Sequence, residues 1–156
     1  MIKWILLAVL AALALGQFIT GDVLYGYDGR WRYPSRWIPP KQRTFTPAEL
    51  ALYNGRDPSR PIYLSILGNV YDVTRGGSTY KPGGSYWFFA GKDASRAYVT
   101  GCFKTHLTHD LRGLGEEDLQ QIDAWNTFFA ENPRYQKVGT LQLPLIDPKT
   151  SPPEPC

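Results

Sequence analysis

The sequence has little of the residues that build metal clusters or disulfide scaffolds. Its 156 residues include two cysteines and two histidines. Two cysteines exclude a disulfide scaffold and a four-cysteine metal site. The formal net charge is only +3, which argues against nucleic acid as a partner. The sequence also has no phosphate-binding loop, nucleophile elbow or zinc-protease motif, and we therefore expect a non-enzymatic protein.

The length and composition favour one compact domain with attachments. Apolar residues make up 43% of the chain, and it contains 15 glycines and 13 prolines. This apolar content is typical of a globular protein and too high for a disordered one. We expect four parts: a signal anchor or signal peptide (1–21), a linker (22–42), a folded domain (43–142) and a Pro-rich tail (143–156).

The first attachment is an apolar run that follows Lys3, WILLAVLAALALGQFITG, residues 4–21. As a helix it would measure about 27 Å, close to the hydrocarbon thickness of a bilayer. An uncleaved anchor, a signal peptide cleaved near residues 16–21 and a soluble core helix all remain open. Arg30, Arg32 and Arg36 favour a cytosolic domain by the positive-inside rule, whereas signal-peptide likeness favours the opposite side.

The linker and the tail give weaker signals. Trp31 and Trp37 suit a membrane interface, although packing against the domain explains them equally well. The tail, PLIDPKTSPPEPC from Pro144, is too rich in proline for a helix or a central strand, and we expect it to be extended.

Short helices and short strands alternate in the domain. Thr46 and Glu49 form a capping box at the start of a short helix. Residues 62–67 and 70–73 predict strands around a tight Gly68-Asn69 turn, and Asp93 caps a predicted helix over 94–100. Residues 116–131 predict the longest helix and 135–143 a final strand. This mixture predicts an α+β domain.

The helix over 116–131 is predicted to be amphipathic. Leu119, Ile122, Trp125 and Phe129 recur at helical spacing along one face. Three acidic residues in its first turn stabilise the helix N-terminus.

The central segment, GGSTYKPGGSYWFFAGKDASRAYVTGCF over residues 76–103, is a glycine-rich loop leading into a helix. Glycines let the backbone approach a bound object, and clustered aromatic rings can line a flat apolar pocket. The residues alone leave two readings open: a pocket for a flat hydrophobic ligand, or a turn followed by core aromatics.

Four stretches resemble the cytochrome b5-like haem/steroid-binding domain, and more narrowly the membrane-associated progesterone receptor family. They are GNVYDVT (68–74), YKPGGSYWFFAGKDASRAYVTGC (80–102), the helix with Trp125, and YQKVG (135–139). The AGKDASRAYVTG stretch is most similar to the neuferricin branch. The resemblance covers about two thirds of the chain and implies a cytochrome b5-like fold with short helices around a small mixed sheet.

The resemblance implies non-covalent haem b as the cofactor, held through a tyrosine. The His-Pro-Gly-Gly loop of true cytochromes b5 has Lys81 here in place of the histidine. The family's ligating tyrosine matches Tyr86, and a second tyrosine beside the haem matches Tyr80. Arg134 and Tyr135 match a basic residue and a tyrosine that support the ligand or a propionate. The usual residue before this tyrosine is lysine, but arginine also pairs with carboxylates.

The histidines and Cys102 give weaker evidence for a functional role. His106 lies near the spacing of a second haem ligand, but an exposed loop position for His106 and His109 is the simpler interpretation. Cys102 is expected to be a buried small residue.

The resemblance implies a membrane-anchored protein of the endomembrane system, in particular the endoplasmic reticulum, or a secreted one if the N-terminus is cleaved. It implies P450-type or sterol-synthesis enzymes as partners, and a homodimer if one haem face is exposed. An electron carrier for a membrane oxidase, a sterol-binding protein and a secreted neuferricin-like factor are the alternatives.

Overall fold

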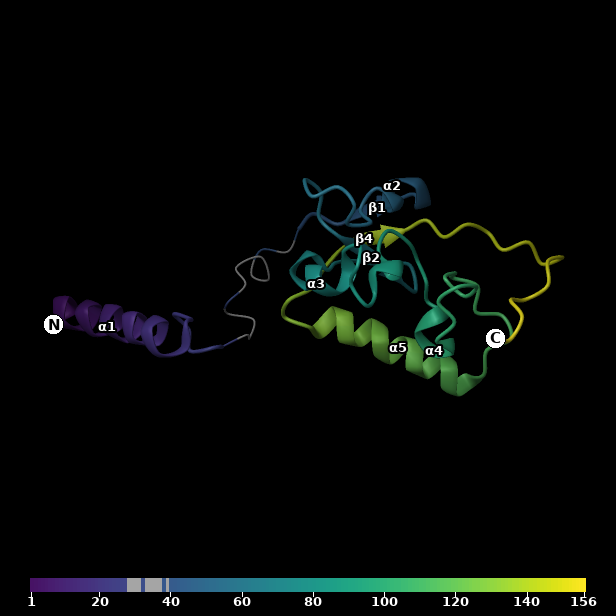
Figure 1. Cartoon of the computed structure of the whole chain (residues 1–156). Helices are drawn as coiled ribbons and strands as arrows, with labels where there is room; N and C mark the ends of the chain where they lie inside the picture. The colour runs from purple at the N-terminus through teal and green to yellow at the C-terminus, as the bar shows by residue number, and fades with distance from the viewer. Residues whose placement is uncertain (28–31, 33–37, 39) are drawn as a thin grey trace.

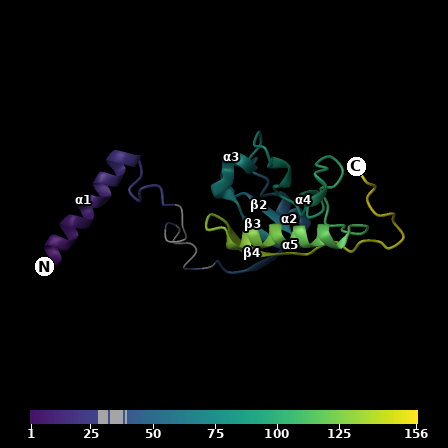
Figure 2. The same ribbon diagram turned by 90° about the horizontal axis from the view of Figure 1, so that it is seen from below.

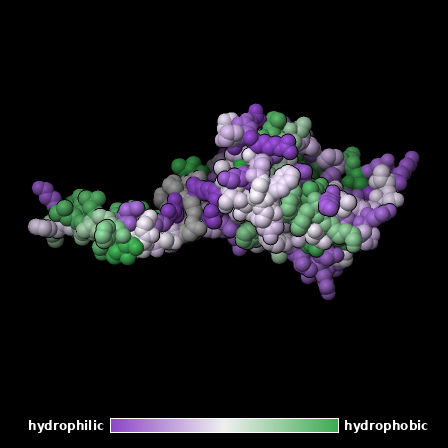
Figure 3. Space-filling model, viewed as in Figure 1, coloured by the Kyte–Doolittle hydropathy of each residue, from purple (hydrophilic) through white to green (hydrophobic). Residues whose placement is uncertain are grey.

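The computed structural model describes residues 1–27, 32, 38 and 40–156. The predictions for Trp31, Trp37, Arg30 and Arg36 lie outside the described residues. The first element, α1 (Ile2–Thr20), stands apart from the remaining helices and strands (Figures 1 and 2). It is long and apolar enough to cross a membrane, and a signal sequence would meet the same test. Hydrophobic residues cover much of its visible face (Figure 3).

A four-stranded mixed sheet forms the centre of the domain. Its strands are β1 (Arg43–Phe45), β2 (Tyr63–Ile66), β3 (Asn69–Asp72) and β4 (Gln136–Leu141), in the order β1-β4-β3-β2. β1 pairs parallel to β4, and the other two pairs are antiparallel. Gly139 lies opposite Arg43, and a Cβ at residue 139 would overlap the Arg43 carbonyl oxygen. Only glycine therefore lets β1 join the sheet here.

Short helices surround the sheet, and the predicted α+β class is confirmed. They are α2 (Pro47–Ala51), η3 (Thr74–Gly76), α3 (Gly77–Tyr80), η4 (Trp87–Phe89) and α4 (Ala97–Thr100). The longest domain helix, α5 (Glu116–Glu131), has the predicted bounds. The predicted capping box is also present, because Thr46 Oγ1 accepts from the Glu49 amide while Glu49 Oε2 accepts from the Thr46 amide.

Several local predictions need correction. The hairpin turn is Leu67-Gly68 rather than Gly68-Asn69, with φ of 49° and 72°. The helix predicted over 94–100 begins only at Ala97. Asp93 is buried and accepts hydrogen bonds from the Gly68 amide at 2.9 Å and the Ser65 hydroxyl at 2.7 Å. The prediction that Asp93 caps this helix is therefore wrong, because Arg96 is at the N-cap, and Asp93 instead fastens the hairpin to the segment before α4.

Two hydrophobic clusters use different positions of the sheet. The larger, here called the helix-side cluster, includes Leu64, Ile66 and Tyr71 with residues of α3, η4, α4 and α5. The smaller, here called the β1-side cluster, contains Phe45, Leu50, Val70, Val138 and Leu141. Neighbouring residues Val70 and Tyr71 fall into different clusters because alternate strand residues point to opposite faces.

Along α5, the predicted apolar face is only partly correct. Ile122 and Phe129 are buried, whereas Leu119 and Trp125 are each about two fifths exposed at 38% and 42%. The ring of Trp125 lies 5.7 Å from that of Tyr98 on α4. α5 therefore contributes to the core and to a partly open surface beside α4.

The tail does not stay free of the domain. It continues from β4 as an extended segment and returns to the loops beside α4, where the chain ends (Figures 1 and 2). Cys156 forms a disulfide with Cys102. The expectation that Cys102 is only a small buried residue is therefore wrong. The prediction of exposed loop histidines is also wrong for His106, which is 2% exposed.

Candidate functional site

A cavity of about 270 Å³ opens between η4, α4 and α5. Its walls are mainly aromatic and aliphatic carbon, and this size and character suit part of a flat organic ligand. The lining residues are Tyr80, Tyr86, Phe89, Ala97, Tyr98, Val99, Thr100, Gly101, Phe103, Trp125 and Phe129.

The glycine-rich loop determines where Tyr86 lies. Gly83 has a φ of +90°, and a Cβ on Gly84 would overlap the Thr79 carbonyl oxygen. The loop can therefore fold tightly back on α3, and the Tyr86 amide donates to that same oxygen at 3.0 Å. This fold places Tyr80, the last residue of α3, and Tyr86 on the wall of the same cavity.

The two predicted tyrosines differ in their access to solvent. Tyr86 is 47% exposed, whereas Tyr80 is buried. Burial is the main cause that raises the pKa of Tyr80 far above its usual value, with further contributions from Tyr135. Tyr80 therefore stays a neutral hydrogen-bond donor, because a buried phenolate is poorly solvated. Tyr86 is the phenol at the open side of the cavity.

Behind Tyr80 lies the predicted Arg134-Tyr135 pair. The Tyr80 and Tyr135 rings meet edge to face with centroids 6.1 Å apart, and their hydroxyl groups are hydrogen-bonded. Arg134 donates from Nη2 to the Arg75 carbonyl oxygen at 2.8 Å. Both members of the pair line a neighbouring cavity of about 300 Å³ with Arg75. The structure thus brings Tyr80 and Tyr86 to the apolar cavity, Tyr135 against Tyr80, and Arg134 to the adjoining one.

Sequence reasoning did not single out Tyr98. Its ring stacks on Phe89 with centroids 4.2 Å apart, and its hydroxyl is buried without a hydrogen-bond partner among the described residues. Burial raises the pKa of Tyr98 well above its usual value. The only sequence signal was its place within the AGKDASRAYVTG stretch.

Further rings complete the rim of the cavity. Phe103 stacks on Phe88 with centroids 4.4 Å apart and is 39% exposed. Trp125 lines the same cavity from α5 and is also partly exposed. The rim therefore keeps apolar surface in contact with water, which is the property expected of a site that a flat apolar molecule covers.

His106, whose spacing suggested a second haem ligand, does not line the cavity. His106 Nδ1 lies 2.9 Å from the Thr100 hydroxyl and Nε2 lies 2.7 Å from the Glu154 carbonyl oxygen, so both ring nitrogens are engaged. His106, Cys102 and Cys156 lie within 4.8 Å of one another. Because the two sulfurs are bonded to each other, this cluster is a disulfide beside a buried histidine. Lys81 is exposed and lies outside the cavity lining.

Comparison with known proteins agrees with this geometry. Over 64% of this chain, the structure matches an Arabidopsis thaliana protein solved with a cytochrome b5 like fold, at a TM-score of 0.56 and 40% identity, covering 91% of that chain. The domain is a cytochrome b5-like domain. The family model for the cytochrome b5-like heme/steroid binding domain matches residues 46–134. The chain belongs to this family.

Relatives within the family carry membrane and binding-protein names. A membrane-associated progesterone-binding protein 4 of Arabidopsis thaliana is 44% identical over 113 residues, covering 72% of this chain and 45% of that protein. A neuferricin of Xenopus tropicalis is 40% identical over 121 residues, covering 77% and 44%. A membrane steroid-binding protein 2 of Arabidopsis thaliana is 43% identical over 130 residues, covering 81% and 55%. The chain spans about half the length of these relatives.

The residues of the cavity fit a haem. A phenol oxygen is an accepted axial donor for iron, and apolar walls exclude water from a porphyrin face. Tyr86 supplies such a donor at the open side, while Phe103 and Trp125 supply apolar walls. Tyr86 and Tyr80 would hold the group, the first as the iron ligand and the second as a neutral hydrogen-bond donor beside it.

Proposed function

We propose that this chain is a membrane-anchored, non-enzymatic protein that binds haem b non-covalently, with Tyr86 as the axial ligand. The observation that carries the proposal is the position of Tyr86. Of the three tyrosines that line the apolar cavity, Tyr86 has the most exposed side chain, whereas the hydroxyl groups of Tyr80 and Tyr98 lie in the protein interior. Haem enters the cavity from solvent, so the side chain that binds its iron has to be accessible at the open side.

Tyr80, Tyr135 and Arg134 have supporting roles in this proposal. Tyr80 stays protonated, and its hydroxyl is hydrogen-bonded to that of Tyr135. Turned toward the cavity, the same O–H would stabilise an anionic oxygen placed beside it. Tyr135 fixes the Tyr80 ring from behind. Arg134 lies in the adjoining cavity, where its permanent positive charge suits a carboxylate such as a haem propionate.

Phenolate ligation stabilises ferric over ferrous iron, because phenolate is a hard anionic donor. This preference argues against a rapid electron carrier and favours haem handling, or modulation of P450-type or sterol-synthesis enzymes. The apolar α1 helix and the membrane-associated relatives support membrane anchoring, for which we propose the endoplasmic reticulum.

An absorption titration of haemin into the full chain in detergent tests the ligand assignment. We expect the wild type to give a stoichiometric ferric high-spin Soret band, and Tyr86→Phe to lose it. Tyr63→Phe is the matched control, because Tyr63 packs against the β1-side cluster, away from the cavity. An unchanged Tyr86→Phe spectrum contradicts the assignment.

A sterol is the second candidate ligand. The observation in its favour is the predominantly carbon lining of the cavity, together with relatives named as steroid-binding proteins. A sterol would need no iron ligand. Saturable sterol binding that Tyr86→Phe leaves intact, with no Soret band for the wild type, would support this candidate over haem.

A further inference from the structure

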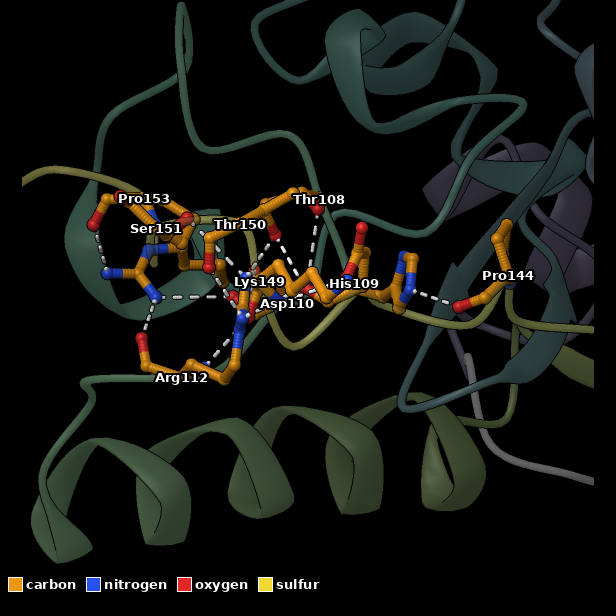
Figure 4. Close-up of polar contacts among 11 residues, drawn as sticks. Thr108, His109, Asp110, Arg112, Pro144, Lys149, Thr150, Ser151 and Pro153 are labelled. Carbon is orange, nitrogen blue, oxygen red and sulfur yellow. Dashed lines mark hydrogen bonds and ion pairs between the residues drawn. The ribbon is translucent and has the colours of Figure 1, made fainter.

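The C-terminal segment 144–156, here called the strap, is fastened to the domain by four side chains from residues 96–112. Arg112 holds the strap at several points near Thr150, and Figure 4 shows these contacts together with those to Pro144 and Pro153. Each of the four side chains binds at least one carbonyl oxygen of the strap: His109 that of Pro144 (2.9 Å), Arg112 that of Thr150 (3.0 Å), Arg96 that of Pro153 (3.2 Å) and His106 that of Glu154 (2.7 Å).

Arg96 shows that the strap is part of the folded structure. It is only 4% exposed, and its guanidinium donates to the carbonyl oxygens of Asp110, Arg112 and Pro153. A buried cation is costly unless its donors are satisfied. The strap therefore supplies one of the acceptors that Arg96 needs.

The disulfide closes the strap covalently. Cys102 and Cys156 are 54 residues apart in sequence, with Cα atoms 6.3 Å apart, a separation that a disulfide normally spans. A cross-link between residues so distant in sequence strongly restricts the unfolded chain and thereby stabilises the folded state.

The strap and the cavity share one wall. Cys102 lies between Gly101 and Phe103, which both line the cavity. His106 connects the two sides directly, because one ring nitrogen contacts the Thr100 hydroxyl on the cavity wall and the other contacts the strap at Glu154. Arg96 immediately precedes α4, which contributes its four residues to the lining.

We propose that the Cys102–Cys156 disulfide is a covalent lock on the α4 wall of the cavity, so that ligand affinity depends on the redox state of this pair. Opening the lock frees the strap end, and residues 97–103 lose the support that His106 and Arg96 transmit. Binding must then also order residues of the cavity wall, and this cost lowers the affinity for the ligand. The affinity part of the proposal rests on the proposed function of the cavity.

The chemistry of the lock is thiol–disulfide exchange. A dithiol reductant supplies two electrons and two protons, the S–S bond breaks into two thiols, and the reductant becomes a disulfide. Disulfides persist in oxidising compartments. The locked form therefore belongs to a domain on the lumenal or extracellular side of the membrane, against the weak preference of the arginines after α1.

The test compares oxidised, reduced and reoxidised full chain with Cys156→Ser and Cys102→Ser. Lys149→Ala is the matched control, because it alters an exposed strap residue with no contact to the lock. A maleimide mass tag counts free thiols on denatured protein, amide hydrogen exchange follows residues 97–103, and haemin titration gives the affinity.

We expect no free thiols and a monomer on a non-reducing gel for the oxidised chain. Reduction and either cysteine variant should speed exchange over residues 97–103 and weaken haemin binding about tenfold, and reoxidation should reverse both changes. Lys149→Ala should match the wild type.

Three results would overturn the lock: free thiols in chain recovered from an oxidising compartment, a disulfide-linked dimer in place of the internal bond, or exchange over 97–103 that reduction leaves unchanged. If reduction speeds amide exchange over residues 97–103 but the oxidised chain binds no haemin, the proposed haem function is wrong. The proposal that the disulfide orders the α4 wall is then still supported. The exchange readout keeps the two failures distinguishable.

Discussion

The two faces of the sheet are built for different purposes. The β1-side cluster is a small core in which Phe45 meets Tyr53 and Tyr63 edge to face, with centroids 6.0 and 5.8 Å apart. The helix-side cluster borders a cavity, and Tyr98, whose hydroxyl has no hydrogen-bond partner in the described part of the chain, packs against it. The difference shows that one face is packed for stability, while the other gives up packing and hydrogen bonding to keep space for a ligand.

The largest expected effect is on the face with the β1-side cluster. Phe45→Ala removes a fully buried ring and should lower the free energy of unfolding by about 4 kcal/mol. Haemin affinity of the remaining folded protein should not change, because Phe45 lies across the sheet from the cavity. Urea unfolding and haemin titration check this. A large loss of affinity in folded protein would show that the two faces are not independent.

Alkaline pH should act on the open face. Burial raises the pKa of Tyr80 and Tyr98 above the value of about 10 that they have in the unfolded chain. Above pH 10 the unfolded chain loses these protons first, so stability should fall by about 1.4 kcal/mol per pH unit for each group. Below pH 10 these groups should cause no pH dependence. Denaturant unfolding between pH 8 and 11 measures the slope, and Tyr98→Phe should make it shallower.

Phe103→Ala should separate binding from stability. The side chain is 39% exposed, so its removal should cost only about 1 kcal/mol of unfolding free energy, from lost ring stacking with Phe88. Because Phe103 forms part of the rim, we expect haemin affinity to fall about tenfold. Comparable affinity in mutant and wild type would remove Phe103 from the site.

The smallest effect should be a gain. Tyr98→Phe removes a buried hydroxyl that has no partner among the described residues and keeps the ring that stacks on Phe89. The free energy of unfolding near pH 7 should rise by about 1 kcal/mol. Thermal unfolding measures it. A loss of stability would mean that the hydroxyl has a partner in solution, such as water.

Local signals in the sequence were sufficient for much of the fold. The capping box at Thr46, the hairpin around Gly68 and the helix over 116–131 depend on residues close in sequence. The capping box and the helix form as predicted, and the hairpin forms with its turn one residue earlier. The resemblance supplied the fold and indicated Tyr80 and Tyr86, which do line one cavity.

The features that sequence reasoning missed depend on distant residues. β1 has three residues, too few to show alternation, and it exists because β4 lies beside it. The pairing of Cys102 with Cys156 and the burial of His106 both require the strap to return. The position of Tyr98 depends on the packing of Phe89 and α5 around it. None of these is encoded by a local pattern.

The close approach of Gly139 to Arg43 has a mechanical consequence. β1 is the first strand after α1, and it joins β4 in parallel along three residue pairs. When the N-terminal helix is pulled while the C-terminal end of β4 is held, the two parallel strands are pulled along each other in opposite directions. Their hydrogen bonds then bear the force together instead of opening one at a time. The pairing that glycine permits at residue 139 thus makes the first strand a shear-resistant attachment between the apolar helix and the domain.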